Sequence, residues 1–325
     1  MNNVLFYILI LTMSLFLTWL VKRWAIKKSI IDFPNERSSH STPTPRGGGF
    51  AIVFVFYVCI LFFYIKGQIE KDLFFALLPG FGLALVGIFD DLKSLSPSIR
   101  IIVQFLCSGI ALYFLGGFHS FFNDDLVWLW SLIALVGFVW FINLFNFLDG
   151  SDGYASMEAL SISLALWFFT GTNVFLLLVF SVCGFLYWNC PKAKIFMGDA
   201  GSTTLGFILV VFGIYLHNKG TFNFTYWILI TALFWFDATV TLMRRIINKE
   251  HLSKAHKNHI FQRAILGGFS HLEVLISGLG INLILFFICF CIWKDIISYL
   301  SGFLIAFLIL WFAMKYVDKK FAFVK

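Results

Sequence analysis

The chain has 325 residues, of which 60% are hydrophobic and only 13% are charged, and its mean hydropathy is +0.89. Soluble domains carry about a quarter charged residues, so this composition excludes an ordinary soluble globule and predicts a polytopic helical membrane protein. The formal net charge of +7 requires no nucleic-acid partner, because the basic residues gather in short loops on one side, where they signal membrane topology.

Eleven apolar runs are candidates for membrane-spanning helices, each of which needs about 20 apolar residues. The first run is too long for a signal peptide and lacks a charged start and a cleavage site, so we expect it to remain a span. No polar stretch is long enough for a second soluble domain, so residues 1–325 are expected to form one all-α membrane domain. The runs lie near residues 3–21, 48–65, 73–89, 100–117, 126–148, 154–171, 173–190, 203–217, 222–243, 271–291 and 296–314.

Basic residues set the expected orientation, because Lys and Arg gather in short loops on the cytosolic side. With the N-terminus outside and the C-terminus inside, the cytosolic side holds all of the 24 Lys and Arg residues except Lys66, Lys71, Lys219 and Lys294. This side also attracts anionic lipid headgroups. The cytosolic loops are then expected near residues 22–47, 90–99, 143–153, 191–202 and 244–270.

The most informative segment is 143–153, where an apolar run ends in Asn143, Asn146, Asp149 and Asp152. Polar and ionisable groups at the end of a membrane segment cost free energy and usually mark a functional site. On a helix the four residues would share one half of the cylinder, while the two glycines of the segment favour a break. Oxygen ligands beside a flexible turn suit a hard cation that carries a phosphate. A turn that only caps two helices is the alternative.

Two more acidic motifs follow apolar runs on the same side. Asp90 and Asp91 end the third run, and because neighbouring side chains on a helix point about 100° apart, one can bind metal or substrate while the other orients a neighbour. Asp199 lies among small residues, before a helix that we expect to start near Ser202 and to aim free N–H groups at an anion. Solvated acids and a helix cap are the respective alternatives.

The first cytosolic loop supplies donors for phosphate. Arg37, His40 and Arg46 precede a run of three glycines that permits backbone contact with an anion. A plain basic loop explains Lys22 to Lys28 but not the prolines and glycines.

The last large loop contains a second group of donors. His256 and His259 are spaced i, i+3, so they would share a face of a helix, and Arg263 follows them. No Cys or carboxylate completes a zinc set, which favours an anionic substrate, with solvated histidines as the alternative.

Asp237 lies inside the ninth run and needs a partner there. Arg244 or Arg245, about two helical turns later, is the nearest candidate. A structural ion pair and a catalytic role are both open on this evidence.

Taken in order, these motifs resemble those of the polyprenyl-phosphate N-acetylhexosamine-1-phosphate transferase family, also called glycosyltransferase family 4. The resemblance covers nearly the whole chain: DxPxxRxxH before a Gly run, GIxDD, NxxNFxDGxDG, FMGDxGS, the segment 237–245 and the His loop. It is closest to the branch that starts O-antigen or related surface glycans. It departs from the peptidoglycan branch, whose loop has consecutive histidines where this chain has two other residues between His256 and His259.

The resemblance implies transfer of a sugar 1-phosphate from a UDP-N-acetylhexosamine to undecaprenyl phosphate, with release of UMP, at the cytosolic face of the bacterial cytoplasmic membrane. It implies Mg²⁺ or Mn²⁺ on the diphosphate, held by Asn146 and Asp199. Asp90 and Asp91 match the catalytic acid pair, Asp152 would hold the nucleoside, and the remaining substrate contacts would come from Arg37, His40, Arg100, Asn143, Asp149, His256, His259 and Arg263.

Two points of mechanism stay open. A phosphate monoester has a second pKa of about 6 and is mostly dianionic at pH 7, so the Asp pair can serve to position the acceptor rather than to remove a proton. Direct displacement and a covalent aspartyl-phosphate intermediate are both compatible with the sequence, and so are a monomer and a homodimer.

The sequence from His251 to Arg263 resembles the loop of members that use 6-deoxy donors such as UDP-N-acetylfucosamine or UDP-N-acetylquinovosamine. We therefore expect a preference for those donors, with UDP-N-acetylglucosamine as the alternative. A secondary transporter would hold its charged groups near the bilayer midplane, and a binding-only scaffold would not need four acid and amide groups on one face. Both are disfavoured, because the motifs lie at the cytosolic ends of the runs.

Overall fold

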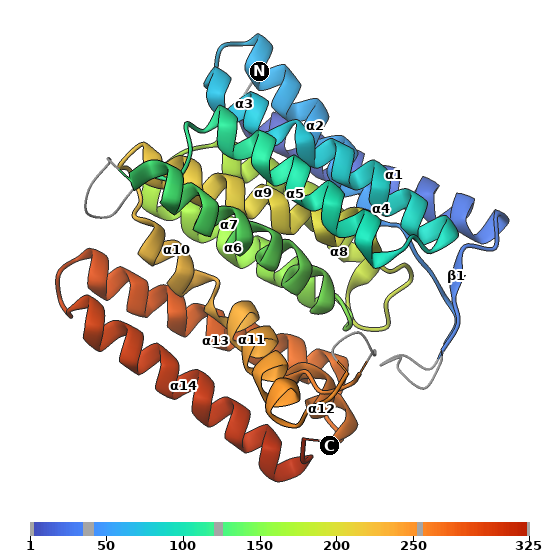
Figure 1. Ribbon diagram of the computed structural model, residues 1–325. Helices are drawn as coiled ribbons and strands as arrows, with labels where there is room; N and C mark the ends of the chain where they lie inside the picture. Colours follow the sequence, from blue (N-terminus) through green and yellow to red (C-terminus); the bar gives the residue numbers. More distant parts are fainter. Residues whose placement is uncertain (1–2, 35–41, 120–125, 252–255, 324–325) are drawn as a thin grey trace.

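The computed structural model describes residues 3–34, 42–119, 126–251 and 256–323, which are almost entirely helical (Figure 1). Two short antiparallel strands, β1 (Ile31–Asp32) and β2 (Thr44–Pro45), pair Ile31 with Pro45. The helices are α1 (Asn3–Lys27), α2 (Gly49–Ile65), α3 (Lys71–Leu77), α4 (Pro79–Lys93), α5 (Pro97–Phe114), α6 (Val127–Phe147), α7 (Tyr154–Thr170), α8 (Val174–Asn189), α9 (Asp199–Asn218), α10 (Phe224–Ile230), α11 (Ala232–Ile247), α12 (Ile260–Leu266), α13 (His271–Trp293) and α14 (Tyr299–Lys320).

The expected all-α membrane fold is confirmed. Within the described residues, seven helical stretches are long and apolar enough to cross a membrane, and the bent pair α10–α11 makes an eighth. Each of the eleven predicted runs contains a helix or a helix pair, but α2, α7 and α8 have only 16 or 17 residues and fall short of this length. The orientation of the termini remains a prediction.

Helix α9 lies at the centre of the first nine helices, with most of its length buried against α2, α4, α6 and α7. Small residues bring its neighbours close. A Cβ at Gly87 of α4 would lie 2.5 Å from the Cα of Ala200, and one at Gly49 of α2 would clash with the Cα of Gly201. Such close backbone approach is typical of packed membrane helices, and here it brings the last turn of α4 beside the first turn of α9.

Helices α10 to α14 form a second group that lies along one side of the first (orange to red in Figure 1). The axes of α10 and α11 are bent by 74°. Thr231 lies at the break, and its hydroxyl donates to the carbonyls of Trp227 and Ile228, which belong to the preceding turn. Hydroxyl bonds of this kind compete with the helix ladder and bend helices.

The main contact between the two groups is the packing of α7 against α13. Gly278 makes it close, since a Cβ there would lie 2.8 Å from the Tyr154 ring. One turn further on, Asn282 donates to Glu158 at 2.6 Å, and both side chains are buried. This contact ties the second group to α7 and therefore to the turn that precedes α7.

Candidate active site

Three helices meet at one end of the bundle and bring together Asp90 and Asp91 of α4, Asn146 of α6 and Asp199 of α9, which we call the acid cluster. Asp90 and Asp91 occupy the last turn of α4, which ends at Lys93. Asp199 is the first residue of α9, because Gly198 before it has φ +76°. The helix therefore begins three residues before Ser202, where the sequence had led us to expect it.

Arg100 connects two acids of the cluster. Its Nη1 lies 2.9 Å from Oδ2 of Asp90 and 3.3 Å from Oδ2 of Asp199. Ser96 caps α5, whose first turn carries Arg100 directly after the short link from α4. The side chain is 35% exposed, so its guanidinium can also donate to a phosphate that approaches from outside.

Asp91 faces the start of α9 on one side and a second arginine on the other. Its Oδ1 accepts from the Asp199 N–H at 3.3 Å and lies 3.8 Å from Nε of Arg46. Arg46 is held there because the adjacent Gly48 and Gly49 N–H groups donate to the carbonyls of residues 196 and 197. In the described structure Oδ2 of Asp91 is buried without a hydrogen-bond partner, which suits a cation or a proton at this atom.

The cluster has the donor chemistry of a magnesium site. Asn146 donates from Nδ2 to Oδ1 of Asp199 and to Oγ of Ser202, both at 2.9 Å. Mg²⁺ usually takes one or two protein ligands and completes its shell with phosphate and water. Asp199 fits this role as it stands, and Asn146 fits once its amide turns its oxygen to the ion. No ready-made set of three His, Cys, Asp or Glu ligands occurs among the described residues, so the substrate would have to supply ligands.

The turn 148–153 joins α6 to α7 beside the acid cluster. Helix α6 ends at Phe147, and Gly153 has φ +72°, which confirms the break that the glycines predicted. Two contacts fix the turn to the chain before α9: Gly153 N–H donates to Oδ1 of Asn189, and Asp152 accepts from the Ala193 N–H at 3.0 Å. Asp152 is therefore held close to the segment that leads to Asp199.

Asp149 lies in the same turn, among other acids. Burial raises the pKa of Asp149 well above its usual value, and the charges of Asp199, Asp91 and Asp152 raise it further. This crowding of negative charge favours a cationic or proton-donating ligand at the turn.

Asn143 lies one turn before Asn146 on α6. Its amide pairs reciprocally with that of Gln104 on α5, at 2.6 and 3.3 Å. The structure thus gives Asn143 a helix-to-helix contact, and its expected role in substrate binding remains a prediction. Arg37 and His40 lie outside the described residues, between the paired strands β1 and β2.

Asp237, His256 and His259 form a second group, which we call the histidine cluster. Oδ1 of Asp237 accepts from the Ile260 N–H at 2.9 Å, lies 3.1 Å from the Thr241 hydroxyl and lies 3.2 Å from Nδ1 of His259. The rings of the two histidines are 5.0 Å apart. They are neighbours as expected but do not share a helix, because α12 begins only after His259, which caps it.

The expected pairing of Asp237 with Arg244 or Arg245 is wrong. Asp237 binds His259 instead, whereas Arg244 forms two hydrogen bonds to Asp318 of α14 and Arg245 lies 2.9 Å from Glu250. The reason is geometric: α12 folds back against α11 and brings His259 closer to the acid than either arginine.

Arg263 also binds Asp318, and it donates to the carbonyl of Phe321 at 3.2 Å. With a side chain only 1% exposed, Arg263 fastens α12 to the end of α14. Its expected contact with substrate remains a prediction.

Comparison with known proteins adds to this geometry. The sequence pattern described as "Glycosyl transferase family 4" matches residues 73–217. A probable undecaprenyl-phosphate N-acetylglucosaminyl 1-phosphate transferase of Bacillus subtilis is 32% identical over 324 residues, which cover 94% of this chain and 88% of that protein. The chain belongs to the polyprenyl-phosphate N-acetylhexosamine-1-phosphate transferase family.

Other members of the transferase family match over shorter stretches. The undecaprenyl-phosphate alpha-N-acetylglucosaminyl 1-phosphate transferase of Thermotoga maritima is 30% identical over 81% of this chain and 83% of its own length. The phospho-N-acetylmuramoyl-pentapeptide-transferase of Petrotoga mobilis is 29% identical over 72% of this chain and 82% of its own length. The residues matched by the family pattern, 73–217, include all four residues of the acid cluster.

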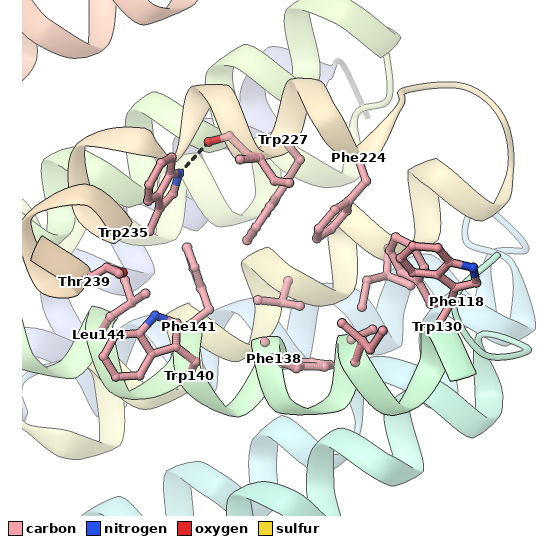
Figure 2. A pocket seen from close by; sticks show the side chains of 16 residues that line it. Phe118, Trp130, Phe138, Trp140, Phe141, Leu144, Phe224, Trp227, Trp235 and Thr239 are labelled. Atoms are coloured by element: carbon pink, nitrogen blue, oxygen red, sulfur yellow. Dashed lines mark hydrogen bonds between the residues drawn. The ribbon is translucent and has the colours of Figure 1, made fainter. Parts of the chain in front are cut away.

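Two cavities lie between the helices. One, of about 420 Å³, lies between α6 and the bent pair α10–α11 and is lined by aromatic and aliphatic side chains, with Thr239 as a polar exception (Figure 2). Its lining on α6 includes Leu144, which points about 200° around the helix from Asn146, so this cavity lies on the opposite face of α6 from the acid cluster. The other, of about 320 Å³, lies between α1, α2 and α4 and ends at Arg46 and Asp91. Apolar space thus reaches the acid cluster from the side of Arg46 and Asp91.

Sequence reasoning missed several residues that hold the site. Ser202 and Asn189 bind Asn146 and the 148–153 turn, Asp318 binds two arginines, and His271 contacts the turn from α13. Ser202 ends the FMGDxGS motif, but the other three belong to no recognisable motif, and the partners of all four lie between 36 and 120 residues away in the chain. Only the folded chain could show them.

Proposed function

We propose that the protein transfers an N-acetylhexosamine 1-phosphate from a UDP-sugar to undecaprenyl phosphate and releases UMP. The observation that carries this proposal is the acid cluster at a helix end, bordered by Arg46 and Arg100 and adjoined by an apolar cavity. A phosphoryl transfer between a polar nucleotide sugar and a lipid phosphate needs these features together. The relatives' names support the same reaction.

The acceptor would approach from the membrane. The cavity between α1, α2 and α4 suits the first units of an isoprenoid chain, because side chains such as Leu20, Trp24 and Phe50 offer apolar surface in place of lipid. Its end at Arg46 and Asp91 would leave the lipid phosphate at the edge of the acid cluster. There, Arg100 would donate to the phosphate, and Asp90 and Asp91 would position it or accept its proton.

The donor would enter from the cytosol, which is the side that the Lys and Arg distribution assigns to the acid cluster. Asp152 would hold the nucleoside, and Asp199 with Asn146 would hold Mg²⁺ or Mn²⁺ on the diphosphate. The ion would neutralise charge on the phosphoryl group as it transfers. Asp149 would face the same ion or the sugar phosphate, in keeping with its crowding by other acids.

The preferred sugar is a finer part of the proposal. We keep the preference for 6-deoxy donors, on the resemblance of the loop from His251 to Arg263. The Bacillus and Thermotoga relatives are named for N-acetylglucosamine, so that sugar is the alternative donor. A pocket shaped around a C6 methyl group rejects an added hydroxyl by only ~100-fold, so we expect preference without exclusivity. A role in starting O-antigen or related surface glycans follows from the same resemblance.

One assay tests the reaction class. Purified protein in lipid nanodiscs is incubated with each of three UDP-sugars, the N-acetyl derivatives of fucosamine, quinovosamine and glucosamine, at equal subsaturating concentration, and UMP release is measured. We expect release only when undecaprenyl phosphate and Mg²⁺ are both present, and loss of release with EDTA. Release without the lipid acceptor, or none with any sugar, would contradict the transferase assignment. Faster turnover of the glucosamine derivative would overturn the 6-deoxy preference alone.

A further inference from the structure

His271, the first residue of α13, contacts the 148–153 turn from the second helix group. Its Nδ1 lies 2.9 Å from the Ser151 hydroxyl and 3.3 Å from the main-chain nitrogen of Asp152. The same ring nitrogen is 3.9 Å from Oδ1 of Asp152. One imidazole therefore meets the hydroxyl, the backbone and the carboxylate of two consecutive turn residues.

The backbone contact determines which form of the ring is present. A main-chain N–H can only donate, so Nδ1 of His271 must accept and carries no proton. The Ser151 hydroxyl, which can rotate, then donates to the same nitrogen. In this arrangement Nδ1 of His271 acts toward the turn as an acceptor, which is what the Asp152 N–H requires.

The turn is also fixed from the opposite side. Asn189 accepts from the Gly153 N–H, and the Ala193 N–H donates to Oδ2 of Asp152. These partners belong to the first helix group, whereas His271 comes from the second. Asp152 is therefore held in place by both groups.

We propose that His271 is a positioning residue for nucleotide binding, and that its Nδ1 holds the Ser151–Asp152 backbone so that the Asp152 carboxylate faces the nucleoside of the donor. The inference rests on the proposed transferase function and deepens it. His271 does not touch the reacting phosphate; it acts through the turn. It is expected to affect the KM for the UDP-sugar far more than kcat.

Two amide substitutions separate this role from general packing. Asn places an acceptor oxygen near the position of Nδ1, whereas the longer Gln places it near Nε2. We expect H271N to keep a KM close to wild type, and H271Q and H271A to raise the KM for the UDP-sugar about tenfold, as the loss of one or two hydrogen bonds implies. His119, near the far end of α9, provides the control H119N, which should leave KM unchanged.

UMP binding to each purified variant in nanodiscs, measured by calorimetry, supplies a readout independent of turnover, and melting temperatures establish that each variant is folded. Wild-type KM and UMP affinity in folded H271Q and H271A would overturn the inference. The inference would also be overturned if H271N bound UMP as weakly as H271A, because the acceptor at Nδ1 would then be irrelevant.

If the α13 variants unfold, S151A tests the same contact from the turn. It removes one donor to Nδ1, so we expect a smaller rise in KM of a few fold, and unchanged KM would count against the proposal. Failure of the wild-type protein to release UMP with any UDP-sugar would refute the transferase function itself. The two failures are therefore distinguishable.

Discussion

The acid cluster and the histidine cluster both contain titratable groups at the ends of helices, but their hydrogen bonds are arranged differently. In the histidine cluster, Asp237 accepts from His259, from Thr241 and from the backbone of α12, so its carboxylate is well supplied with donors. In the acid cluster, Asp91 retains a buried oxygen without a partner in the described structure. The second arrangement suits a ligand, whereas the first is typical of a carboxylate that stabilises a fold. The expected substrate contacts of His256 and His259 remain predictions.

The two clusters meet at the 148–153 turn. The ring of Phe261, two residues after His259, stacks on Tyr154 at 5.3 Å, and a Cβ at Gly150 would lie 3.0 Å from the same Phe261 ring. The turn also carries Asp149 and Asp152. A change in the histidine cluster can therefore alter the donor site through packing, without contact with the reacting groups.

The largest expected effect concerns the side of the membrane on which both clusters lie. A reporter fused after Lys325 should be active only as a cytosolic probe, because the distribution of Lys and Arg places the C-terminus inside. Parallel phosphatase and fluorescent-protein fusions measure this all-or-none outcome. Periplasmic activity at Lys325 would place both clusters on the outer face and exclude a cytosolic nucleotide donor.

The next effect tests the acid cluster. Asp199→Asn should lower the rate of UMP release by about 100-fold or more, because a neutral amide holds Mg²⁺ weakly and leaves the transferring charge uncompensated. The melting temperature should change little, since an amide oxygen can still accept from Arg100. Full activity in a well-expressed variant would show that Asp199 serves only to start α9.

In the histidine cluster we expect the reverse, a loss of stability with activity retained. Asp237→Leu removes the shared acceptor of His259, Thr241 and the Ile260 N–H. Leaving buried donors unpaired should cost about 3 kcal/mol of stability, seen as a lower melting temperature in nanodiscs. The protein that remains folded should still turn over. A variant that melts like wild type but has lost turnover would show that Asp237 acts in the chemistry.

The smallest effect is a pH dependence of the histidine cluster. Burial, followed by the neighbouring His259, lowers the pKa of His256 from its ordinary 6.5 to about 4, against the opposing charges of Glu250 and Asp237. The unfolded chain therefore binds more protons between these values, so stability is complete above pH 6.5 and falls as the pH drops toward 4. Between pH 7 and 4 the melting temperature of His256→Gln should fall less steeply than that of the wild-type protein. Parallel curves for the two proteins would contradict this.

The chemistry of this protein was readable from its sequence because apolar runs and polar motifs alternate along it. Hydropathy alone predicted an all-α membrane fold, since a span must satisfy its backbone hydrogen bonds within itself. The same contrast made Asp90, Asp91, Asn146 and Asp199 conspicuous at the ends of apolar runs. The structure brings these four residues together.

Tertiary structure decided which partner each group takes. Asp237 binds His259 and not the nearby arginines, and Arg263 binds Asp318, because the first turn of α12 bonds to α11 while α12 packs against α13 and α14. His271 reaches a turn 120 residues earlier in the chain. Local periodicity determines which residues can lie on one face of a helix. Pairing between helices depends on how closely small residues let the backbones approach, and this is decided only when all the helices are packed together.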